Sequence, residues 1–231
     1  KTWFLKSKVR IIAQKSLEIG FTTRGPILNI GLAFAVENKD IVVSDIKIRL
    51  KHHSGEERLL EWQGITQHIV KMKTPDLGEM PYEYEKEHSV LAVKLNQKDI
   101  EERSIRFQDP KFITSQREYI NKAAKKMEYL KAEEKFTSDD FLREQEMTDL
   151  YSFFKHEFSW KQGRYIVAIE MKSPENFKVV DNIREFDLTA EDIERLERNK
   201  DQLESDYKRI FVGAPDPEEA SWQWCWPLLM K

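Results

Sequence analysis

Residues 27–36 read ILNIGLAFAV, and this stretch indicates the fold more clearly than any other part of the chain. Its large apolar side chains recur at every second position, the spacing that places them on one face of a β-strand. The positions between them hold Asn, Gly and Ala, so the other face carries only small side chains. We expect the large face to lie in the core and a second layer to pack on the small face.

The same alternation extends to both sides of this strand. It predicts strands over residues 42–50, 58–62, 90–95, 104–107 and 164–171, and shorter ones over 177–180 and 183–188. Residues 63–88 are weakly patterned and contain two glycines and two prolines, so we predict a long loop there.

Elsewhere the apolar spacing becomes helical. Residues 115–158 carry two apolar stripes at steps of three and four, which predict two antiparallel helices, the second beginning near residues 137–140. A further helix is expected over 189–212, with Thr189 as N-cap and Asp192 near the reciprocal position of a capping box.

These elements predict a mainly β fold with added helices. The specific expectation is an immunoglobulin-like antiparallel β-sandwich with a two-helix insertion and a C-terminal helix. The expected divisions are a sandwich domain over 1–110 and 163–188, a helical insertion over 111–162, a C-terminal helix over 189–212 and a Trp-rich tail over 213–231.

Residues 26–30, 36–38 and 46–50 resemble the opening strands of immunoglobulin-like modules found in many cell-envelope and interaction proteins. The resemblance covers about a quarter of the chain. It implies a fold and no functional residue, because one fold serves many functions.

Composition limits the classes of partner. The 231 residues carry a net charge of -3, which does not provide the strongly basic surface typical of nucleic-acid-binding domains, so we expect no nucleic-acid partner. Cys225 is the only cysteine, which excludes an intramolecular disulfide and favours a reducing compartment such as the cytoplasm.

The first ten residues mix Trp3, Phe4 and Leu5 with four basic residues. This pattern occurs at the cytoplasmic end of membrane helices, and also in an ordinary first strand with solvated lysines. Both interpretations stay open, so the chain is either a free protein or the soluble part of a membrane-attached one. In the second case we expect it at the cytoplasmic face of the membrane.

Catalytic and cofactor motifs are missing from the sequence. It has no nucleophile elbow, no phosphate-binding loop and no dinucleotide fingerprint, so we expect no cofactor and no catalytic residue. Adjacent His52 and His53 are expected on opposite faces of a strand, and no metal-ligand spacing is present, so we expect no metal site.

Trp222, Trp224 and Trp226 are the candidate partner or ligand surface. In an extended segment their indoles share one face, suited to stacking on a ligand or partner, or to a membrane interface. The alternative is a tail that covers the core with large apolar side chains.

The function expected from these features is a non-catalytic protein-interaction or scaffold module that binds another protein or itself. The alternative is a hydrolase-type enzyme whose site is assembled from scattered acidic and histidine residues. Its candidates lie in and beside the predicted 63–88 loop: Asp76, Glu79, His68 and His88.

Overall fold

The computed structural model of the chain describes residues 6–71, 82–88, 91–213 and 222–231, of which 66–71 and 82–88 are described by their backbone alone. The elements follow in this order: β1 (Ser7–Ala13), β2 (Glu18–Thr22), β3 (Gly25–Glu37), β4 (Ile41–Val43), β5 (Asp45–His52), β6 (Glu57–Lys71), β7 (Tyr82–His88), β8 (Val93–Leu95), β9 (Ile100–Gln108), α1 (Pro110–Ala132), α2 (Ser138–Leu142), α3 (Gln145–Glu157), β10 (Gly163–Lys172), β11 (Phe177–Val180), β12 (Ile183–Leu188), α4 (Ala190–Glu197), α5 (Asn199–Val212) and β13 (Trp224–Cys225).

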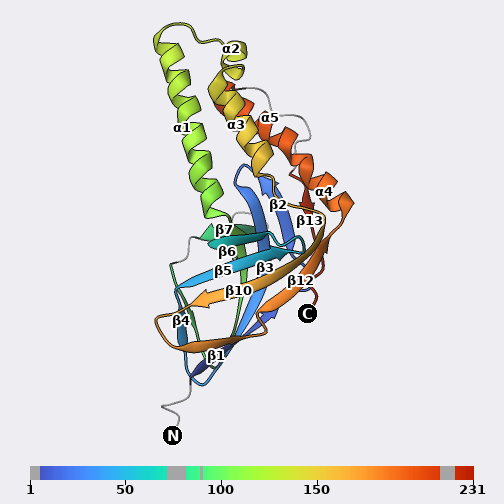
Figure 1. Cartoon of the computed structure of the whole chain (residues 1–231). Helices are drawn as coiled ribbons and strands as arrows, with labels where there is room; N and C mark the ends of the chain where they lie inside the picture. Colours follow the sequence, from blue (N-terminus) through green and yellow to red (C-terminus); the bar gives the residue numbers. More distant parts are fainter. Residues whose placement is uncertain (1–5, 72–81, 89–90, 214–221) are drawn as a thin grey trace.

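One curled sheet contains all of the described strands except β4 and β8, which pair with each other (Figure 1). Its main path is β11-β1-β3-β9-β6-β5-β10-β12, with β2 and β13 attached to β3 and β7 attached to β6. Neighbouring strands run antiparallel, apart from the parallel pair formed by β1 and β11. The helices stand together at one end of the sheet.

The predicted mainly β fold with added helices is confirmed, whereas the immunoglobulin-like sandwich is not. The sheet is a curled half-barrel because two long strands change partner along their length. The first half of β3 pairs with β2 and its second half with β1, and β6 pairs first with β5 and then with β9 and β7. Alternating side chains predict a buried face equally well for two packed sheets and for one curled sheet.

The large face of β3 lies in the core as predicted, with Leu28, Ile30, Leu32, Phe34 and Val36 at most 5% exposed. Its small face is half-buried, and single side chains cover it in place of the expected second layer. The Gln14 side chain, for example, lies over Gly31.

The predicted loop over 63–88 is wrong at both of its ends. β6 continues to Lys71 and β7 returns antiparallel to it, in register from Ile65 opposite His88 to Lys71 opposite Tyr82. A shift of register between Trp62 and Gly64 marks a bulge, which interrupts the alternation that identifies a strand in sequence. Residues 72–81 lie outside the described part of the chain.

The predicted helical pair lies between β9 and β10. Asp109 caps α1 by accepting hydrogen bonds from the backbone N–H groups of Lys111 and Phe112, and Thr137 caps α2 in the same way. α1 packs against α3 through stacked rings of Tyr119 and Phe153, whose centroids are 4.8 Å apart.

The final helix is divided at Arg198 into α4 and α5. Its predicted start is confirmed, because Thr189 and Asp192 form both hydrogen bonds of a capping box. Past the break Leu203, Tyr207 and Phe211 are buried, whereas Ile210 is 60% exposed. The Tyr207 ring stacks on Phe154, which joins α5 to α3.

Residues 222–231 are extended and cross from β2 to β12. β13 pairs with β2, and the following residues form bridges from Leu228 to Ser16 and from Met230 to Glu185. The Asn199 side chain holds the start of the tail by donating to the carbonyl of Gln223 and accepting from its N–H, both at 2.8 Å. The tail therefore links two parts of the sheet that do not pair directly.

Candidate ligand pocket

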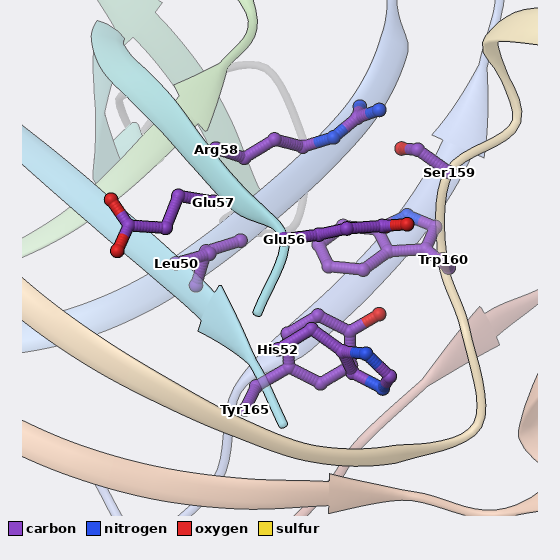
Figure 2. A pocket seen from close by; sticks show the side chains of 8 residues that line it. All are labelled: Leu50, His52, Glu56, Glu57, Arg58, Ser159, Trp160 and Tyr165. Atoms are coloured by element: carbon purple, nitrogen blue, oxygen red, sulfur yellow. The ribbon is translucent and has the colours of Figure 1, made fainter. Parts of the chain in front are cut away.

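A pocket of about 280 Å³, partly open to solvent, lies where the β5–β6 hairpin meets the connection between α3 and β10 (Figure 2). It combines apolar, aromatic and charged side chains, the mixture typical of small-molecule sites. The residues that line it are Leu50, His52, Glu56, Glu57, Arg58, Ser159, Trp160 and Tyr165.

Arg58 points to the buried face of the sheet because of its place in β6. It lies directly opposite Leu50 of β5 and two residues before Leu60, which are 2% and 0% exposed. Paired residues of neighbouring strands share a face, and so do alternate residues of one strand. The strand pattern thus places a guanidinium group among core aliphatic side chains.

Two polar atoms of this pocket are buried without a hydrogen-bond partner among the described residues: Arg58 Nη1 and Ser159 Oγ. The nearest carboxylate to the guanidinium is that of Asp109, with Oδ2 at 3.9 Å from Nη1. That separation allows electrostatic attraction but exceeds hydrogen-bond length. Buried polar groups are nearly always hydrogen-bonded, so these two atoms are the ones in this pocket that are free to bond a ligand.

The other walls of the pocket are held firmly. The Trp160 indole N–H donates to the carbonyl of Gly20 at 3.0 Å. Tyr165 Oη accepts from the backbone N–H of Lys161 at 2.8 Å, and its ring stacks on Phe186 at a centroid distance of 5.0 Å. Burial is the main reason that the pKa of Tyr165 is raised, which keeps the hydroxyl protonated at neutral pH.

His52 is also fixed, and both of its ring nitrogens are engaged. Nε2 donates to the carbonyl oxygen of Gln162 at 3.0 Å, and Nδ1 accepts from the backbone N–H of Ser54 at 3.3 Å. Neither ring nitrogen is hydrogen-bonded to Ser159 in the described part of the chain.

Glu56 lies at the rim and forms an ion pair with Lys161. The hydrogen bond from Lys161 is the main reason that the pKa of Glu56 is lowered, so this carboxylate is ionised at neutral pH. Figure 2 shows Glu56, just before β6, and Arg58 of β6 extending toward the segment that carries Ser159 and Trp160, whereas Glu57 points the other way. Glu57 forms ion pairs with Lys51 and Arg49 on the outer face.

The three tryptophans of the predicted surface do not form one free face. The Trp224 ring lies over Gly20, and Trp222 packs against the core, which leaves Trp226 with 57% of its surface exposed. Cys225 is buried between them, and burial raises the pKa of its thiol to about 12. Trp222 and Cys225 thus pack in the core, and the indole of Trp226 is left to solvent.

The scattered acid and histidine candidates fall where the structure describes no side chains, so this hypothesis stays a prediction. Asp76 and Glu79 lie outside the described residues, and His68 and His88 lie on β6 and β7, where the backbone alone is described. Within the described residues, no cluster of three or more His, Cys, Asp or Glu side chains is arranged to hold a metal ion. His52 is buried and His53 exposed, but the prediction that they lie on opposite faces is wrong, because β5 ends at His52, His53 lies in the following turn, and their ring centroids are 4.1 Å apart.

Sequence reasoning missed the pocket, although one signal for it was available. The alternation over 58–62 places Arg58 on the same side as Leu60 and Trp62, and a charge at an inward position is unusual. Ser159 and Trp160 follow the end of α3 in an unpatterned connection, so only the folded chain brings them to Arg58.

Comparison of the chain with protein families, with curated proteins and with solved structures finds no match. Of the helices in the described part of the chain, none has the length and apolar character needed to cross a membrane.

Proposed function

We propose that this chain is a non-catalytic binding module whose pocket receives a carboxylate group. The observation that carries the proposal is the buried, unbonded Nη1 of Arg58, with the equally unbonded Oγ of Ser159 in the same pocket. A carboxylate oxygen accepts from both groups, and a guanidinium binds carboxylates more strongly than neutral acceptors.

The energetics support a bound anion. A buried donor without a partner costs about 1–3 kcal/mol, and a ligand oxygen at hydrogen-bond distance removes this cost. Asp109 does not do so, because its Oδ2 lies 3.9 Å from Nη1, beyond hydrogen-bond length, while its Oδ1 accepts from the N–H groups of Lys111 and Phe112. The fixed rings of Trp160 and Tyr165 let a ligand bind without first ordering the walls.

Two sources of the carboxylate fit a binding module. One is a protein partner, or a second copy of this chain, that presents an acidic side chain or a chain terminus. The other is a free small acid. Attachment of the module to a membrane through a segment outside these residues is compatible with both.

The test uses 3-phenylpropanoate and its uncharged amide, titrated into ¹⁵N-labelled protein. The reporter is the indole N–H signal of Trp160, assigned by its loss in Trp160→Phe. We expect the acid to shift this signal with saturation and the amide to bind at least about tenfold more weakly, since a charge-assisted hydrogen bond contributes about 1.5–3 kcal/mol.

Arg58→Met is expected to abolish the preference for the acid. Arg49→Met is the matched control, because Arg49 precedes Leu50 on β5 and points to the outer face, where it pairs with Glu170. Equal binding of acid and amide, or an acid preference that survives Arg58→Met, contradicts the proposal. Short peptides with a free or an amidated C-terminus, titrated in the same way, distinguish a protein carboxylate from a small acid.

A further inference from the structure

We infer that the carboxylate ligand is a zwitterion, a free α-amino acid with an apolar side chain. This inference rests on the proposed function and adds a second recognition element, the carboxylate of Glu56. Glu56 directly precedes β6, two residues before Arg58; both side chains line the pocket and extend to the same side of it (Figure 2). A site that offers an acceptor beside a donor suits a ligand that carries both charges.

The charges around the pocket are balanced before any ligand enters. Arg58 faces Asp109, and Glu56 is paired with Lys161. A simple carboxylate adds a negative charge close to the ionised Glu56, which opposes its binding. An ammonium group on the ligand offsets this repulsion, because it interacts with Glu56 while the carboxylate binds Arg58.

The two charges of an α-amino acid are attached to neighbouring carbons, so both lie within one pocket of about 280 Å³. A peptide supplies both charges only when it is very short, which favours the free amino acid over the terminus of a protein partner.

The size and lining of the pocket indicate the ligand's side chain. The volume of about 280 Å³ falls just below the range of about 300–1,000 Å³ usual for drug-sized ligands. Leu50, Trp160 and Tyr165 provide an apolar and aromatic wall. An aromatic or branched aliphatic side chain fits this wall, and aromatic rings favour edge or offset stacking on Trp and Tyr.

The test compares three ligands of one skeleton, each titrated into the whole chain with the Trp160 indole signal as readout. L-Phenylalanine carries both charges, 3-phenylpropanoate lacks the ammonium group, and phenethylamine lacks the carboxylate. Glu56 is at the rim, so its contribution is that of an exposed ion pair. We therefore expect phenylalanine to bind about two- to fivefold tighter than 3-phenylpropanoate, and phenethylamine to bind weakest.

Glu56→Gln is expected to remove the advantage of phenylalanine and to strengthen the binding of 3-phenylpropanoate. Glu170→Gln is the matched control, since it makes the same change on a carboxylate that lies outside the pocket and pairs with Arg49 on the outer face. The advantage of phenylalanine should also shrink in high salt, which screens an exposed pair.

The outcomes separate the two proposals. If 3-phenylpropanoate binds through Arg58 as tightly as phenylalanine, or if Glu56→Gln leaves the ratio of the two affinities unchanged, the zwitterion inference is wrong and the carboxylate site remains. If neither acid binds in a way that depends on Arg58, the carboxylate site itself is wrong.

Discussion

Replacing Arg58 with methionine should stabilise the ligand-free protein. Arg58 occupies an inward position of β6 between Leu50 across the sheet and Leu60 along the strand. Methionine has a similar length and no polar group, so it extends the apolar surface already present there. Residues that bind a ligand often reduce the stability of the empty protein. Arg58 is expected to do so because its Nη1 is buried without a hydrogen-bond partner among the described residues.

The expected gain follows from two opposing effects. Removing a buried donor without a partner is worth about 1–3 kcal/mol. The substitution also removes the attraction of Asp109 at 3.9 Å, a pair in which the Arg58 side chain is 31% exposed, so this loss is about 0–1 kcal/mol. Asp109 keeps its hydrogen bonds to the start of α1 and is not left unsatisfied.

The net expectation is a free energy of unfolding higher by about 1 kcal/mol, which raises Tm by about 2–4 °C for a chain of this size. Urea unfolding followed by circular dichroism measures the first quantity, and a thermal scan the second. Arg49→Met serves as control and should change stability by at most about 1 kcal/mol. A loss of more than about 1 kcal/mol in Arg58→Met refutes the reasoning, because it shows that the guanidinium supports the fold through Asp109.

Three further predictions concern the C-terminal tail and α4. Gly20→Ala should destabilise the protein by about 1–3 kcal/mol in urea unfolding, because a Cβ at this position collides with the Trp224 ring. Unchanged stability would show that the Trp224 ring does not pack against Gly20. Cys225 is buried and the pKa of its thiol is raised to about 12, so it should react slowly with a thiol reagent in the folded protein. Asn199→Ala removes the hydrogen bonds between Asn199 and Gln223 and should accelerate this reaction about tenfold or more. Equal rates show that these bonds do not hold Cys225 in the core. Burial tends to raise the pKa of Asp192, but hydrogen bonds from Thr189 outweigh burial and lower the pKa below 3.8. Asp192→Asn should therefore destabilise the protein above about pH 4, and this difference from the wild type should vanish as the pH falls through the lowered pKa. A difference that persists in acid shows that the charge is not responsible.

Local patterns in the sequence predicted the elements that bury one face. The alternation of β3 and of β10 is strict, and the residues expected inside, such as Leu32, Phe34 and Val167, are buried. The cap at Thr189 was predictable for the same reason, since its chemistry depends on neighbours within four residues.

The closure of the sheet was not predictable in this way. Whether alternating strands form two sheets or one curled sheet depends on which strands change partner, as β3 and β6 do. The bulge after Trp62 hid the second half of β6, because one extra residue reverses the pattern of inward and outward positions. Pairings between segments far apart in the chain leave no local signature.

The pocket shows the same limit. Arg58 was visible as a charge at an inward position, but its significance depends on the absence of a hydrogen-bond partner, which only the folded structure shows. Ser159 and Trp160 reach the pocket because α3 ends beside the β5–β6 hairpin. The Trp222–Trp226 segment was predicted as one face, whereas pairing of the tail with β2 turns Trp224 onto Gly20.

A crystal structure of the protein with saturating 3-phenylpropanoate tests the carboxylate site most directly. We expect a carboxylate oxygen of the ligand within about 3.2 Å of Arg58 Nη1, with the phenyl ring of the ligand against Trp160 and Tyr165. An empty pocket in which Arg58 Nη1 instead bonds directly to Asp109 would contradict it.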